Sequence, residues 1–173
     1  GSTKILKAMR RKYTAEEYLE LVGKMRAKMP NLAIGTDIIV GFCGETEEDF
    51  LATYNLMKTV RFDSAFMFKY SPRKGTLAER KFIDDVPPEE KSRRLTEIIE
   101  LQEKISLDIN KTFIGKTVEV LAEGESKRNS NQLFGKTDSF KTTVFPKDNV
   151  EVGQFVPVKI KDATAHTLLG EIV

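Results

Sequence analysis

The sequence is poor in the residues that build metal centres and disulfide scaffolds. Its 173 residues include one cysteine, one histidine and no tryptophan. A single cysteine cannot form an internal disulfide, and iron–sulfur clusters or structural zinc need several thiolates or imidazoles at set spacing. Cys43 and His166 therefore exclude a disulfide-rich secreted scaffold and a metal centre built from this chain alone.

Long apolar runs and an excess of one charge are also missing. No run approaches the ~18 apolar residues of a membrane helix, and the first twelve residues lack the hydrophobic block of a signal peptide. Lys and Arg total 28 against 26 Asp and Glu, so a net charge of +2 does not by itself indicate a nucleic-acid partner. With 40% hydrophobic residues, we expect a globular, cytoplasmic protein without a membrane partner.

The residue pattern changes near position 111, which predicts two domains, 1–111 and 112–173. In the first domain, helix and strand patterns alternate. Thr14 and Thr46 each begin a capping-box sequence that predicts the start of an amphipathic helix. A third, long helix is predicted to start at the proline pair that ends with Pro88.

Two strands are predicted between these helices, at 32–42 and 65–70. The first is so rich in Ile and Val that it is expected to be buried on both faces, as in a parallel sheet. Strand, helix and strand in that order make a parallel unit, but two strands cannot cover three helices. The first domain is therefore predicted to be α/β and part of a larger barrel or doubly wound sheet.

Two turns follow these strands, at the end where parallel α/β sheets bind ligands. The first contains Gly41 and Gly44, which allow close backbone approach, and it leads into a helix N-terminus with free N–H groups. The second turn, 70–76, carries Arg73, whose guanidinium can clamp a carboxylate or phosphate. Both turns can equally be ordinary strand–helix connections, and this alternative stays open.

Asp37 interrupts the otherwise apolar first strand. A carboxylate buried there must be paired or hydrogen-bonded. Asp37 is therefore either a structural partner of a basic group on a neighbouring strand or a functional residue.

The second domain alternates short Val, Thr, Phe and Ile runs with Gly, Asn, Ser and Pro, which is typical of small all-β proteins. Five strands are predicted, at 116–123, 133–137, 142–145, 155–161 and 168–173. This number suits an OB-like barrel, a fold that commonly binds oligonucleotides. Cations would contact phosphates and exposed rings would stack on bases, unless the phenylalanines are core and the lysines a solvated surface. The candidates are Lys127, Arg128, Lys136, Lys141, Lys147, Phe134, Phe140 and Phe145.

Several strings, taken together, resemble the radical SAM methylthiotransferases. In the first domain these are 36–42 (TDIIVGF), 44–50 (GETEEDF), 62–65 (FDSA) and 70–76 (YSPRKGT), with Met9, Arg11, Tyr13 and Thr14 upstream. In the second domain, 115–121 (GKTVEVL), 132–137 (QLFGKT) and 144–146 (VFP) resemble the TRAM domain of that family, a small RNA-binding β-barrel. The similarity runs in order along nearly the whole chain and is greatest to the MiaB branch, which acts on tRNA.

The resemblance implies an enzyme with an N-terminal methylthiotransferase domain, a radical SAM barrel and a TRAM domain. A CxxxCxxC motif in the barrel binds a [4Fe–4S] cluster that cleaves S-adenosylmethionine into a radical, and a second [4Fe–4S] cluster is linked to sulfur supply. Such an enzyme adds a methylthio group to N6-isopentenyladenosine next to the tRNA anticodon. Its implied partners are tRNA and a sulfur donor, and the full-length enzyme is expected to be monomeric.

This chain departs from the complete family pattern because neither cysteine set is present, and Cys43 stands where the family usually has proline. The expected fold is a partial radical SAM (βα) barrel followed by an OB-like TRAM barrel, inactive alone, with no catalytic residue and no metal ligand. The resemblance places four residues at the barrel mouth, where we expect cofactor binding: Asp37, Gly41, Tyr70 and Arg73. Expected RNA contacts are Lys127, Arg128, Lys136, Lys141 and Phe134.

Two alternatives remain on the sequence alone. One is an RNA-binding module without catalysis. The other is a sibling methylthiotransferase that acts on another modified adenosine or on a ribosomal protein.

Overall fold

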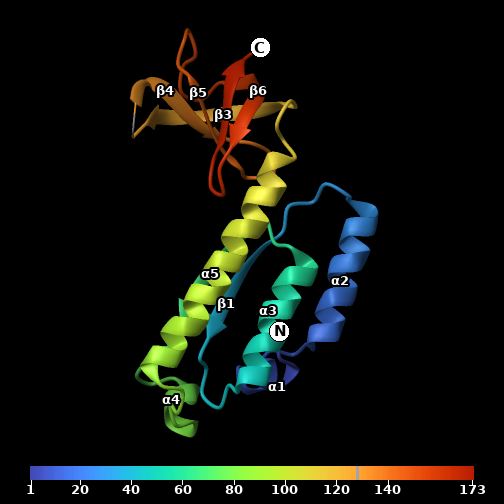
Figure 1. Ribbon diagram of the computed structural model, residues 1–173, viewed down its shortest axis with the longest axis vertical. Coiled ribbons are helices and arrows are strands. Elements are labelled where there is room, and N and C mark those ends of the chain that lie inside the picture. Colours follow the sequence, from blue (N-terminus) through green and yellow to red (C-terminus); the bar gives the residue numbers. More distant parts are fainter. Residues whose placement is uncertain (128) are drawn as a thin grey trace. The chain divides into compact units, whose positions relative to one another are not determined.

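The computed structural model describes residues 1–127 and 129–173, so Arg128, an expected RNA contact, lies outside the described residues. The chain divides into two compact units, Gly1–Gln102 and Glu103–Val173. Figure 1 shows helices and a short sheet in the first unit and a small β-barrel in the second. The domain boundary expected between residues 111 and 112 rests on the sequence pattern and stays a prediction.

The first unit is built from helices around a two-stranded parallel sheet. Strand β1 pairs with β2 in register from Gly35 opposite Ser64 to Val40 opposite Lys69. Helix α5 continues into the second unit, which begins at Glu103. The elements are α1 (Thr3–Ala8), α2 (Ala15–Lys28), β1 (Gly35–Val40), α3 (Glu47–Val60), β2 (Ser64–Lys69), α4 (Leu77–Lys81) and α5 (Pro88–Lys111).

Helices α2 and α3 begin at the two capping boxes expected from the sequence. The Thr14 hydroxyl accepts a hydrogen bond from the Glu17 amide at 3.2 Å, and the Glu17 carboxylate accepts one from the Thr14 amide at 2.8 Å. Thr46 and Asp49 make the same reciprocal pair. Each box satisfies two backbone donors that a helix start otherwise leaves without a partner.

The expectation that the first strand is buried on both faces is wrong. Ile38 and Val40 are buried, but Asp37 and Ile39 are exposed on the opposite face of β1. Because side chains alternate along a strand, the two faces of β1 have different neighbours. The exposed face continues onto β2, where Phe66 lies opposite Asp37.

Helices α1 and α4 were not anticipated from the sequence. They have six and five residues, which is too short for a helical periodicity to register. Ser2 and Thr76 nevertheless cap them with side-chain acceptors.

The second unit contains a closed five-stranded barrel, which confirms the α/β followed by all-β fold class. Its order is β3-β4-β5-β7-β6, and every neighbouring pair is antiparallel except β5 and β7. The barrel core includes Val120, Leu133, Phe145, Val158 and Leu168, all fully buried. The strands are β3 (Thr117–Ser126), β4 (Asn129–Lys136), β5 (Thr142–Pro146), β6 (Phe155–Ala163) and β7 (Leu168–Ile172).

None of the helices in the described ranges is long and apolar enough to cross a membrane.

Candidate functional site

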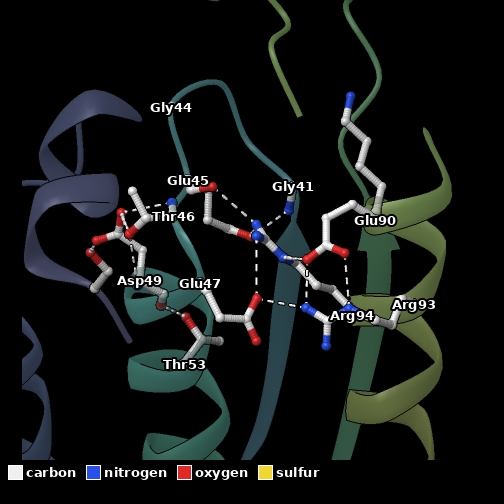
Figure 2. Close-up of polar contacts among 12 residues, drawn as sticks. Gly41, Gly44, Glu45, Thr46, Glu47, Asp49, Thr53, Glu90, Arg93 and Arg94 are labelled. Atoms are coloured by element: carbon white, nitrogen blue, oxygen red, sulfur yellow. Dashed lines mark hydrogen bonds and ion pairs between the residues drawn. The ribbon is translucent and has the colours of Figure 1, made fainter. Parts of the chain in front are cut away.

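The turn between β1 and α3 is held from the side of α5 by a buried ion pair (Figure 2). The Glu45 carboxylate accepts hydrogen bonds from the Gly41 amide at 2.7 Å and from the Arg94 guanidinium at 2.8 Å. Glu45 is 7% exposed and Arg94 only 4%. In such a dry setting each charge depends on the other, so the pair fixes the backbone of the turn.

More exposed charges extend this pair outward. Arg94 also donates to Glu90 at 2.9 Å, and Arg93 donates to Glu47 at 2.6 Å and to Glu90. Hydrogen bonds from Arg93 and then Arg94 lower the pKa of Glu90 to about 2 despite an opposing desolvation effect. The two arginines thus join the start of α3 to the first turns of α5 (Figure 2).

A second anchor sits at the start of α3. Burial by itself would raise the pKa of Asp49, but hydrogen bonds from Lys4, Ser2 and Thr46 hold that pKa well below its usual range. Lys4 lies 2.6 Å and the Ser2 hydroxyl 2.7 Å from the carboxylate. Asp49 therefore ties α1 to the capping box of α3.

Gly41 and Tyr70, two of the expected cofactor contacts, are brought together by Lys91. Gly41 has a φ of +71°, and a Cβ there would lie 2.4 Å from Lys91 Cγ. The Lys91 ammonium is 5.3 Å from the centre of the Tyr70 ring and donates to the Tyr70 carbonyl and to Asp84. Gly41 is thus needed to make room for a buried lysine behind the turn, and its expected contact with a cofactor stays a prediction.

Tyr70 forms part of an aromatic wall after β2. Its ring packs edge-on against Phe42 at 4.9 Å between centroids, and Phe82 packs against Phe42 at 5.8 Å. Burial of the hydroxyl, and then the Cys43 thiol beside it, raise the pKa of Tyr70. The tyrosine is therefore neutral and presents an aromatic surface.

Two pockets lie beside β1. One, of about 160 Å³, includes Asp37 in its lining, and the other, of about 350 Å³, includes Tyr70. Both are lined by Met9, Arg11 and Ile39, so they adjoin. An exposed carboxylate, an arginine and an aromatic wall thus line these two adjoining pockets, which together are called the depression beside β1.

Arg73 is not part of this depression. It is exposed in the loop before α4, and among the described residues neither pocket includes it in its lining. Its backbone carbonyl accepts a 2.8 Å hydrogen bond from Thr76, which caps α4. Sequence patterns assign no role to Lys91 or to Arg11. The segment that contains Arg11 (residues 9–14) contributes to the family resemblance, but only the fold shows that it lies beside β1.

The expected RNA contacts of the second unit divide between surface and interior. Phe134 and Lys136 lie two residues apart on β4 and are half-buried, so they share the outer face of the barrel. Lys127 is exposed, whereas Lys141 is only 7% exposed and does not present its ammonium on the surface. Of the other candidates, Phe145 is core and Lys147 forms an ion pair with Glu125 at 2.6 Å.

Phe155 was missed among the aromatic candidates. It is 64% exposed at the start of β6, where Val156 and Val158 point inward. The alternation of Phe155, Pro157 and Lys159 with valines and isoleucine was the available signal.

The described residues contain no group of three or more His, Cys, Asp and Glu side chains placed to hold a metal ion. Cys43 is buried in the turn after β1.

Two family models match the chain. The radical SAM superfamily matches residues 1–57, and the TRAM domain matches residues 111–173. The first region contains β1, which lines the depression, and the second contains all five strands of the barrel.

Relatives align with this chain over nearly its whole length. Over 173 residues the chain is 53% identical to a tRNA-2-methylthio-N(6)-dimethylallyladenosine synthase of Porphyromonas gingivalis, covering 100% of this chain and 37% of that protein. Proteins of the same name from Parabacteroides distasonis and Azobacteroides pseudotrichonymphae are 53% and 56% identical, over 100% and 99% of this chain and 38% of each relative. The chain spans less than two fifths of these relatives' length, and its two matched regions are similar to the radical SAM superfamily and to the TRAM domain.

Proposed function

We propose that this chain is part of an enzyme that adds a methylthio group to N6-isopentenyladenosine next to the anticodon of tRNA. The observation that carries the proposal is the 53% identity over all 173 residues to a synthase whose name states a 2-methylthio-N(6)-dimethylallyladenosine product. Identity that runs through both the α/β unit and the barrel supports a shared activity better than a match to either region would. On this proposal the enzyme works in the cytoplasm, as a monomer, with tRNA and a sulfur donor as partners.

The depression on β1 fits S-adenosylmethionine in its chemistry. The ligand has a flat adenine, a carboxylate and an ammonium group. Tyr70 and Phe42 offer an aromatic wall, Arg11 a carboxylate partner, and the exposed Asp37 an acceptor for an ammonium or a ribose hydroxyl. When bound and reduced by an iron–sulfur cluster, S-adenosylmethionine supplies a radical. The role of this chain is to hold and orient the cofactor.

The two [4Fe–4S] clusters do not fit this chain. The only cysteine is buried, and the described residues offer no set of metal ligands. Cluster ligands on this proposal belong to the part of the relatives' length that the chain does not span, and we assign no catalytic residue here.

On the barrel, the proposed tRNA contacts are Lys127, Arg128, Lys136 and Phe134. Lys141 is a weaker candidate because its side chain is buried. Arg73 stays a proposed contact to the cofactor or to tRNA, from a loop beside the depression.

The test is nucleoside analysis of tRNA from cells that lack the gene for this protein. We expect loss of 2-methylthio-N6-isopentenyladenosine and accumulation of N6-isopentenyladenosine, measured by liquid chromatography and mass spectrometry. A complementing gene that carries Arg11→Ala should restore less of the product than one that carries Lys12→Ala, the neighbouring exposed cation that lines neither pocket.

The same measurement separates the alternatives. Loss of a methylthio group from a different adenosine would identify a sibling enzyme. An unchanged set of tRNA nucleosides would contradict the proposal and leave an RNA-binding module.

A further inference from the structure

The outer face of the barrel carries a row of side chains that crosses four strands. Leu121 on β3 lies opposite Phe155 on β6 and opposite Lys136 on β4, and Lys136 lies opposite Thr142 on β5. The residues that flank this row, such as Val120 and Thr143, are fully buried. Because side chains alternate along each strand, the row itself points outward.

Two aromatic rings are exposed at this row. Phe155 is 64% exposed and Phe140 is 78% exposed. The Lys136 ammonium lies 5.2 Å from the centre of the Phe140 ring and donates a 2.7 Å hydrogen bond to Thr142. The Lys136 cation thus contacts the Phe140 ring, and the backbone of Lys136 lies two strand spacings, ~10 Å, from that of Phe155 along the row.

The exposure of Phe140 is enforced by its turn. Its φ is +62°, a left-handed conformation that costs a bulky side chain roughly 1–2 kcal/mol. The Thr137 hydroxyl accepts from the Lys141 amide at 3.1 Å, and the Phe140 amide donates to the Thr137 carbonyl at 3.0 Å. A strained backbone thus holds an exposed phenylalanine in this turn, and strained backbone conformations cluster at functional sites.

Phe134 adds a third ring on the same face. It lies opposite both Gly124 and Val144, and its ring edge is 3.0 Å from where a Cβ at Gly124 would be. Gly124 thus leaves room for a ring that lies against the outer surface of the sheet.

The charge of the barrel decides between two modes of RNA binding. Residues 112–173 contain eight Lys and Arg and eight Asp and Glu, so the net charge of this region is 0. A neutral surface gains little from releasing counterions of a duplex backbone, whereas aromatic rings gain from unpaired bases whose faces are free.

We propose that Phe140, Lys136 and Phe155 form a stacking platform for unpaired bases, so that the barrel binds single-stranded RNA segments rather than duplex. This inference rests on the proposed tRNA function for its biological ligand. It names the residues and the structural state of the RNA that they select.

The test uses the 173-residue chain and a fluorescein-labelled single-stranded oligoadenylate ten-mer, with a duplex of the same length as the second probe. We expect tighter binding of the single strand by fluorescence anisotropy. Phe140→Gly and Phe155→Ala should each weaken single-strand binding by about 5- to 100-fold, the loss of one base stack. Phe140→Tyr should retain it. Ile83→Ala, which removes an exposed apolar side chain of the first unit, is the matched control and should bind as the parent does.

Thermal melts by circular dichroism accompany each variant. Glycine adopts the left-handed conformation at position 140 without strain, so Phe140→Gly should melt no lower than the parent. Parent-like binding by Phe140→Gly and Phe155→Ala, or equal affinity for duplex and single strand, overturns the platform. This result is separate from the nucleoside analysis. If the binding assay contradicts the platform but deletion of the gene removes the methylthio nucleoside, only this inference is refuted. If the binding assay supports the platform but the tRNA nucleosides are unchanged, only the proposed function is refuted.

Discussion

At the scale of single residues, Gly41 has a packing reason to be glycine that its sequence setting does not reveal. Its sequence setting, a glycine at the end of a parallel strand, predicts close approach of a ligand. In the fold the space beside its Cα is filled by the Lys91 side chain, 50 residues further along the chain. No local pattern could have paired these two residues.

Gly41→Ala is expected to destabilise the chain by more than about 1 kcal/mol, because alanine is strained at positive φ and its Cβ would meet Lys91. Denaturant unfolding followed by circular dichroism measures the change. The matched control is Gly23→Ala in α2, where a Cβ meets nothing within 4 Å and a helical alanine is favoured by up to ~1 kcal/mol. Equal unfolding midpoints for Gly41→Ala and the parent would contradict this assignment.

Asp37 shows the opposite case. Its place in an otherwise apolar strand predicts burial, and a buried carboxylate needs a partner. The fold exposes it on the face of β1 that adjoins both pockets, so no partner is needed. The alternation was present, with Asp37 and Ile39 on one face and Ile38 and Val40 on the other, but the unbroken apolar run 38–40 hid it.

At the scale of elements, local signals predicted helix starts well. The capping boxes at Thr14 and Thr46 are where the sequence expects them, because their hydrogen bonds join residues three apart. The five barrel strands were also predicted, since each alternates between core and surface. Short α1 and α4 were missed because fewer than two turns carry no periodicity.

The two capping boxes differ in what surrounds them, which predicts different acid sensitivity. The folded pKa of Asp49 lies well below the ordinary value of 3.8. Its stabilisation is therefore complete above that value and declines as the pH falls below about 4. Asp49→Asn should lower the melting temperature at pH 7 and reduce the loss of stability between pH 4 and pH 2.

Glu17→Gln is the control for this prediction. It changes the equivalent position of the exposed capping box of α2 without touching the contacts to Lys4 and Ser2. Its effect at pH 7 should stay below ~1 kcal/mol. If melts of Asp49→Asn parallel those of the parent across this acid range, Asp49 does not carry the acid dependence.

At the scale of the whole molecule, the order of motifs was more informative than any one of them. A glycine turn or a lone aspartate has an ordinary structural explanation. A series of motifs that occurs in both units in the same order as in one protein family does not. The near-neutral charge gave no sign of RNA, and the relation between Phe140, Lys136 and Phe155 needed the barrel register. That surface is formed by contacts between strands that are distant in the sequence, and local sequence patterns do not reveal such contacts.

The chain should not assemble an iron–sulfur cluster. Anaerobic incubation with iron, sulfide and reductant should leave the 173-residue chain without visible absorbance and without bound iron after desalting, because it has one cysteine. Cys43→Ser should behave identically. Stoichiometric iron on the parent that is lost in Cys43→Ser would refute the ligand count.

The Glu45–Arg94 contact also has a consequence for the timing of synthesis. The two residues are 49 positions apart, and the arginine is the later one. At ribosomal speeds of about 5–20 residues per second, the turn after β1 waits roughly 2–10 s for the cation that neutralises its buried carboxylate. Until α5 has been synthesised, the Glu45 carboxylate must stay hydrated, and the turn that contributes Glu45 to the lining of the depression is not yet fixed by its ion pair.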